Sequence, residues 1–88
     1  MARPSSLKNL GPVSDRLLRE VGIETAEEVR RLGSALVYKM LSHRAGRPVN
    51  LLFLYALEGG IQNRNLNAFS PEEKAALRAS VADELTTA

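Results

Sequence analysis

The amino-acid sequence predicts an all-α fold of about five short helices. Apolar residues recur at three- and four-residue spacing, helix start and stop residues divide the chain into short segments, and no segment alternates apolar and polar residues as a half-buried strand does. With 88 residues the chain is long enough for a single domain with one modest core. We expect this domain over residues 7–88, after a flexible lead-in formed by residues 1–6.

The first helix is expected to begin at Pro12, because proline at the first helical position loses no intrahelical hydrogen bond and its φ angle already fits the helix. Gly22 ends this helix as a left-handed cap. The apolar stripe predicted to face the core consists of Val13, Leu17, Leu18 and Val21.

Two further helices are expected before residue 47. Thr25 and Glu28 have the spacing of a capping box, in which the hydroxyl accepts a free amide and the carboxylate reaches back to the threonine N–H. The helix that they start is short and ends at Gly33. Ser34 then caps a third helix, which ends near Gly46.

The fourth segment, LLFLYAL over 51–57, follows the capping residue Asn50. Such an apolar run also fits a buried strand, but it continues into Glu58 and its neighbours are helical, so we expect a helix. A helix that is apolar on nearly all sides belongs at the centre of a fold or at a dimer seam. Gly59 and Gly60 are expected to weaken or end it.

An Asn-rich connection over 61–68 leads to the last helix, whose start is the clearest in the chain. Ser70 is the cap, Pro71 the first helical residue and Glu73 the second member of a capping box. Three apolar residues at four-residue spacing then face the core: Leu77, Val81 and Leu85.

The composition excludes several classes of function. Without cysteine, and with His43 as the single histidine, the chain has no disulfide, no thiolate nucleophile and no multi-histidine metal site, so we expect neither a metal nor a cofactor. Glu58 has no partner histidine or nucleophile, and we do not expect an enzyme. No apolar window spans a membrane and MARPSS is not a signal peptide, which predicts a cytoplasmic protein without a membrane partner.

The charge is small overall but unevenly distributed. The formal net charge is +2, and no acidic residue occurs between Val29 and Leu57. This basic stretch carries the candidate residues Arg30, Arg31, Arg44 and Arg47, together with Lys39. Both a solvated basic face and a surface that faces an anion account for it.

Four segments together resemble one protein family. NLGPVS, VGIETAEEVRRLG, NLLFLYALEGGI and SPEEKAALRA are similar, in order and spacing, to the C-terminal domain of the TfoX/Sxy family of bacterial competence regulators. The block from Leu7 to Gly33 also resembles a helix-hairpin-helix. The resemblance implies a helix-hairpin-helix-like hairpin packed on a central apolar helix, and a non-enzymatic regulatory module in DNA transformation. Helix-hairpin-helix motifs bind the DNA backbone without reading its sequence.

The NLGPVS stretch is the candidate nucleic-acid site. The first turn of a helix has free backbone amides at the positive end of the helix dipole, and a glycine there lets a phosphate approach. Against this, Asn9 replaces the first glycine of the usual hairpin, Pro12 removes a donor and Asp15 places a carboxylate near the site. A turn that only shapes the helix start is the alternative. The candidate residues are Lys8, Gly11, Val13, Ser14, Arg16 and Arg19.

A second hypothesis is a protein-interaction module that does not bind nucleic acid. Surplus apolar residues on the fourth helix would then pack against a second copy of the chain or against a regulator. Phe53 and Tyr55 are the candidates for this interaction surface.

Overall fold

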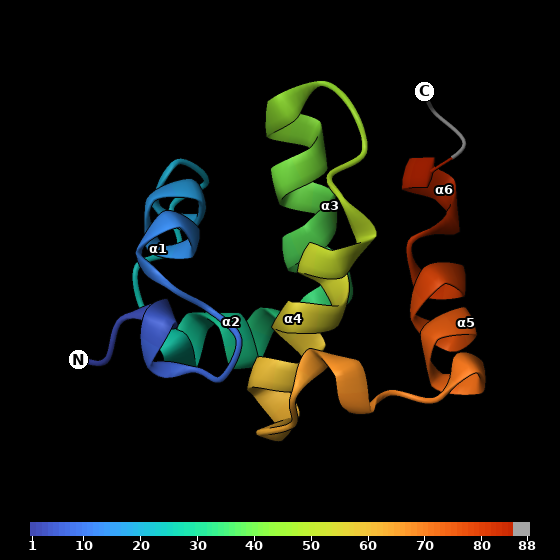
Figure 1. Cartoon of the computed structure of the whole chain (residues 1–88). Coiled ribbons are helices and arrows are strands. Elements are labelled where there is room, and N and C mark those ends of the chain that lie inside the picture. The colour runs from blue at the N-terminus through green and yellow to red at the C-terminus, as the bar shows by residue number, and fades with distance from the viewer. Residues whose placement is uncertain (86–88) are drawn as a thin grey trace.

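A computed structural model describes residues 1–85. They form six helices and two short 3-10 turns: η1 (Pro4–Ser6), α1 (Pro12–Arg19), α2 (Ala26–Leu32), α3 (Ser34–Ala45), α4 (Leu51–Gln62), η2 (Leu66–Ala68), α5 (Pro71–Ser80) and α6 (Ala82–Leu85). No strand occurs in this part of the chain, so the all-α prediction is confirmed. Helix α4 lies at the centre, between the α1–α2 end of the molecule and an arm formed by α5 and α6 (Figure 1).

The capping boxes predicted at Thr25 and Ser70 are confirmed by their hydrogen bonds. Thr25 Oγ1 accepts the N–H of Glu28 and the Glu28 carboxylate accepts the N–H of Thr25, each at 3.1 Å. Ser70 and Glu73 form the same box at 3.1 and 2.8 Å. The pKa of Glu28 lies below its usual value because its carboxylate accepts the N–H of Glu24 and the hydroxyl of Thr25.

The prediction that Ser34 caps the third helix is wrong. Gly33 is the N-cap of α3, and the hydroxyl of Ser34, its first residue, donates to Glu58 instead.

Helix α4 supplies the middle of the hydrophobic core. It packs against α2, α3, α5 and η2, and its large buried side chains belong to the single core cluster, which explains why a short sequence run can be apolar on almost all sides. The prediction of a central apolar helix is therefore confirmed, and of the large apolar residues on α4 Leu52 alone is largely exposed, at 56%. The buried apolar side chains of α4 are Leu54, Tyr55, Ala56 and Leu57, and the rest of the core includes Leu18, Ile23, Val29, Val37, Tyr38, Leu41, Phe69 and Val81.

The prediction that Gly59 and Gly60 weaken or end this helix is wrong. The helix continues to Gln62 and stops at Asn63, which has a left-handed φ of 58°. A Cβ on Gly59 would lie 2.5 Å from the carbonyl oxygen of Arg64 and 2.5 Å from Nδ2 of Asn9, and a Cβ on Gly60 would lie 2.9 Å from the carbonyl oxygen of Lys8. Gly60 therefore lets the backbone at Lys8 pack directly on α4, and Gly59 makes room for the Asn9 side chain and the carbonyl group of Arg64.

The two ends of the fold also differ from expectation. Residues 1–6 were expected to form a lead-in, but Pro4 is buried and the N–H of Ala26 donates to the carbonyl oxygen of Ala2 at 2.9 Å. The predicted last helix is interrupted at Val81, whose φ of −121° leaves the helical region, so α6 is a separate turn. Val81 itself is buried in the core.

Val13 does not face the core as predicted. Its side chain is 58% exposed, whereas Leu18 is buried and Leu17 and Val21 pack at the edge of the core. Val13 belongs to the NLGPVS turn and is the second residue of α1, so it lies at the start of the helix. Its side chain is exposed to solvent there.

The α5–α6 arm is attached by a few side chains. Arg64 pairs with Glu73 at 2.7 Å and lies over the ring of Phe69, and Lys39 pairs with Asp83 at 3.1 Å. Leu77 and Leu85 pack at the edge of the core, and α5 contains no buried residue. None of the helices among residues 1–85 has the length and apolar character needed to cross a membrane.

We predict that Gly59→Ala destabilises the protein by about 1–3 kcal/mol, as overpacking does. At an exposed helix position the same change would stabilise by about 1 kcal/mol. Urea unfolding of the variant measures the difference. Gly11→Ala is the matched control, because a Cβ there meets no atom within 4 Å. A Gly59→Ala protein as stable as the wild type would contradict the close packing at α4.

The pKa of Glu73 should be about 2 rather than 4.5, because its carboxylate accepts hydrogen bonds from Arg64 and from the N–H of Ser70. Because the pKa is lower in the folded protein, the ionised Glu73 carboxylate stabilises the fold above pH 4.5. This stabilisation is lost as the pH falls toward 2. A carbon-13 NMR titration of the Glu73 carboxyl measures its midpoint. In Arg64→Gln the midpoint should move back toward the usual value, and an unchanged midpoint would contradict the assignment.

Candidate functional site

The NLGPVS turn has an unusual backbone at Asn9. Its φ is 73°, in the left-handed region that asparagine tolerates better than other side chains do. The N–H of Leu10 closes the turn by donating to the carbonyl oxygen of Leu7 at 3.3 Å. Gly11 follows in an extended conformation and is the N-cap of α1.

The Asn9 side chain holds the turn against the end of α4. Its Nδ2 donates to the carbonyl oxygens of Arg64 and Ala56, at 2.8 and 3.4 Å, and its Oδ1 accepts the N–H of Leu66 at 3.1 Å. A glycine allows the same backbone angle but makes none of these bonds. Sequence reasoning interpreted Asn9 only as a missing glycine. The sequence does contain a signal for this role: asparagine tolerates a positive φ better than other side chains, and the turn requires a positive φ at this position.

The first turn of α1 opens to solvent. Pro12 and Val13 are exposed. The amides of Val13 and Ser14 lie in the first turn, where a helix N–H has no backbone acceptor within the helix. Ser14 Oγ accepts the N–H of Gly11 at 3.4 Å, so this amide is partly satisfied within the turn. A Cβ on Gly11 would meet nothing within 4 Å, which leaves open space beside the backbone.

Three cations lie before and along α1: Lys8 precedes the helix, and Arg16 and Arg19 lie in its last turn. Lys8, Arg16 and Arg19 are exposed, and none of them takes part in an ion pair within residues 1–85. Arg16 and Arg19 are three residues apart on α1 and therefore lie on neighbouring positions of its surface. Lys8 precedes the helix on the turn that Asn9 holds in place.

The carboxylate expected to repel an anion is turned inward. Asp15 is 9% exposed, and its Oδ1 accepts the N–H of Ser5 at 2.8 Å, which ties α1 to η1. Glu20, at the other end of α1, lines a small cavity that faces α3. Asp15 is thus turned away from the opening at the start of the helix, and Glu20 lies beyond the opposite end of α1.

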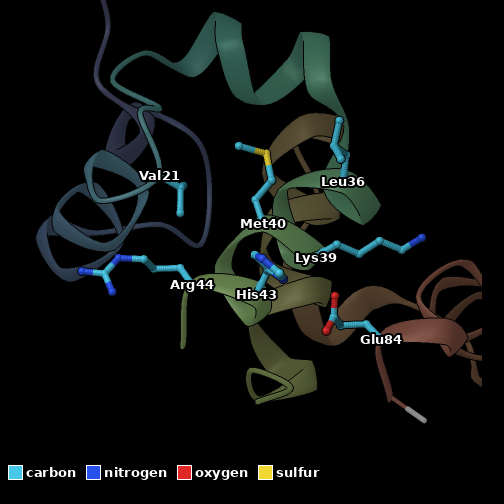
Figure 2. A pocket seen from close by; sticks show the side chains of 7 residues that line it. All are labelled: Val21, Leu36, Lys39, Met40, His43, Arg44 and Glu84. Carbon is cyan, nitrogen blue, oxygen red and sulfur yellow. The ribbon is translucent and has the colours of Figure 1, made fainter. Parts of the chain in front are cut away.

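The structure does not gather the basic stretch into one site. Arg30 and Arg31 are exposed on the last turn of α2, and Arg31 lines the same hollow as Glu27 and Glu28. Arg44 extends from α3 toward Val21, which lies just after the end of α1 (Figure 2). Arg47 is exposed just beyond α3.

The two aromatic candidates for an interaction surface lie in different environments. Tyr55 is 6% exposed; its hydroxyl oxygen accepts a hydrogen bond from Arg78 at 3.0 Å, and Lys74 lies 5.6 Å from the centre of its ring. It is therefore a core residue of this chain. Phe53 is half-buried and lines the small cavity between α1 and α3.

Glu58 has a structural partner. Ser34 Oγ donates to its carboxylate at 2.6 Å and Gln62 donates to the other carboxylate oxygen, so Glu58 joins the start of α3 to α4. Among the residues that the structure describes, no three His, Cys, Asp or Glu side chains are grouped so that they could hold a metal ion.

The chain matches the family model of the TfoX C-terminal domain over residues 2–81. It is also similar to the crystal structure of an uncharacterized protein from Listeria monocytogenes in a triclinic form. That protein is 30% identical, the match covers 88% of this chain and 86% of that one, and the TM-score is 0.78. No curated protein matches the chain.

We predict that Asn9→Gly lowers the free energy of unfolding by about 2–3 kcal/mol, because three hydrogen bonds are lost while the backbone angle stays allowed. Asn9→Ala should lose about 1 kcal/mol more, since alanine also resists the left-handed conformation. Urea unfolding measures both variants. If the glycine variant were as stable as the wild type, the side chain would not be what holds the turn.

Proposed function

Because the chain belongs to the TfoX C-terminal domain family, we propose that it is a non-enzymatic regulatory module that contacts the backbone of duplex DNA through the start of α1. The family is one of non-catalytic regulatory domains. The similarity to competence regulators supports a role in DNA transformation, carried out in the cytoplasm.

One observation supports DNA contact above the others. Lys8, Arg16 and Arg19 are exposed and take part in no ion pair within residues 1–85. They lie before and along α1, a helix whose start is anchored to the core. Lysine and arginine side chains neutralise phosphates, and the amides of Val13 and Ser14 would donate to a phosphate at the start of the helix. A turn already held in its binding conformation loses little entropy when it binds.

Contact with the DNA backbone predicts binding of a particular kind. No aromatic side chain and no amide side chain reaches out from the first turn of α1, so the site has little means of reading base edges. Binding should therefore depend on salt and tolerate different sequences. Arg30, Arg31, Arg44 and Arg47 lie on other parts of the surface and would add a general positive field rather than direct contacts.

The test is a fluorescence-anisotropy titration of labelled duplex DNA at about 50 and 200 mM salt. We expect a dissociation constant of roughly 10⁻⁴ to 10⁻⁶ M that weakens steeply at the higher salt and is similar for unrelated sequences. Arg16→Glu/Arg19→Glu should weaken binding about tenfold or more, because each reversal replaces an attraction with a repulsion.

Arg30→Glu/Arg31→Glu is the matched control, since it changes the net charge equally at a place away from α1. It should weaken binding much less. Equal losses in the two variants would show that only overall charge matters, and no binding at the lower salt would contradict the proposed function altogether.

A further inference from the structure

Helix α5 lies on the surface of the fold along its whole length. Within residues 71–80 no side chain is buried, and only Lys74 and Leu77 are half-buried. Figure 1 shows α5 and α6 at one edge of the molecule, at the end of an extended connection from η2. Because burial of apolar surface is the main force that holds a helix to a fold, α5 itself is attached weakly.

The α5–α6 arm is anchored in the core by one residue. Val81, which lies between the two helices, is the only buried side chain within residues 70–85. A hollow of about 190 Å³ lies between α4 and α5, with Glu58 and Gln62 on one wall and Ala76 and Leu77 on the other. Closely packed helices leave few such spaces, so the two helices touch over only part of their facing surfaces.

The other attachments of the arm are polar contacts. Two are ion pairs between partly exposed side chains, which contribute little to stability because water and salt screen them. The third is a hydrogen bond of 3.0 Å to a tyrosine of α4. The pairs are Arg64 with Glu73, Lys39 with Asp83, and Arg78 with Tyr55.

The segment just before the arm is held independently of it. The carbonyl oxygen of Arg64 and the N–H of Leu66 bond to the side chain of Asn9, at 2.8 and 3.1 Å. Phe69 is buried and packs beside Gly59 of α4. None of these contacts uses a residue of α5 or α6, so residues 1–69 form a body whose boundary with the arm lies at the end of η2.

We propose that the α5–α6 arm opens as one unit while the body, residues 1–69, stays folded. Helix α5 has 10 residues and α6 has 4, which is too short for either to persist alone in water. When Val81 leaves the core the whole arm therefore unfolds together.

Opening uncovers a defined face of α4. The ring of Tyr55 lies 5.6 Å from Nζ of Lys74, and its hydroxyl accepts the hydrogen bond from Arg78, so the arm covers this side chain. The arm is thus a strap that controls access to Tyr55 and to the site that Val81 occupies. This inference goes beyond the proposed DNA contact, because the strap lies on a different part of the chain.

A cysteine probe tests the proposal, since the chain has no cysteine of its own. Val81→Cys places a thiol at the anchor of the arm and Val29→Cys, the matched control, places one in α2; both valines are 0% exposed. A buried thiol reacts with an aromatic disulfide reagent only when the structure opens. In Val81→Cys the reaction should be at least about tenfold faster than global unfolding of the same variant, measured in urea, allows. In Val29→Cys it should match global unfolding.

Hydrogen exchange on the protein without cysteine gives a second, independent test. Amides of α5 from Ala75 to Ser80 should exchange at least about tenfold faster than the amide of Leu66, although Leu66 belongs to a single 3-10 turn. Ile23→Val changes the core of the body. It should speed exchange about twofold to tenfold at amides that exchange through global unfolding, and leave α5 unchanged, because residue 23 stays buried when the arm opens.

Three results would overturn the proposal. The first is a thiol in Val81→Cys that reacts no faster than global unfolding allows. The second is exchange in α5 that responds to Ile23→Val as the core amides do. The third is exchange of α5 and Leu66 at the same rate, which would show that the body does not stay folded when the arm opens.

Discussion

The fold depends on close contact between the NLGPVS turn and the C-terminal half of α4. Two glycines remove side chains from one side of that helix. The backbone at Lys8 fills the space beside Gly60, and the Asn9 side chain and the Arg64 carbonyl fill the space beside Gly59. Asn9 then bonds to backbone groups of Ala56, Arg64 and Leu66, so one side chain joins three parts of the chain. The Arg64 carbonyl and the Leu66 amide lie outside the helix ladder of α4, so Asn9 supplies them with a hydrogen-bond partner at the edge of the core.

This contact explains how a small domain can present a defined surface at its edge. The chain has neither a disulfide nor an identified metal group within residues 1–85, and its core is modest. The start of α1 is nevertheless fixed, because Asn9 anchors the turn before it and Asp15 anchors the helix to η1. The turn and the helix that follows it therefore lie at fixed positions relative to α4.

Much of the fold could be predicted from the sequence because local signals determine it. The boxes at Thr25 and Ser70 act within four residues, and the apolar run at 51–57 marks the central helix. The predictions that failed concern positions whose structure depends on contacts between residues that are distant in sequence. Gly59 and Gly60 look like helix breakers until the turn at residues 7–9 is seen to pack against them. For the same reason the role of Asn9 and the inward direction of Asp15 were not predicted.

Native-state hydrogen exchange at the amide of Leu66 tests the central claim most directly. This amide lies at the start of a single 3-10 turn and donates to Asn9 Oδ1 at 3.1 Å. If the turn is anchored as described, the amide should exchange only through large openings, with a protection close to that of the core amides, and Asn9→Gly should abolish that protection. Exchange in the wild-type protein at nearly the rate of a free peptide would contradict the account.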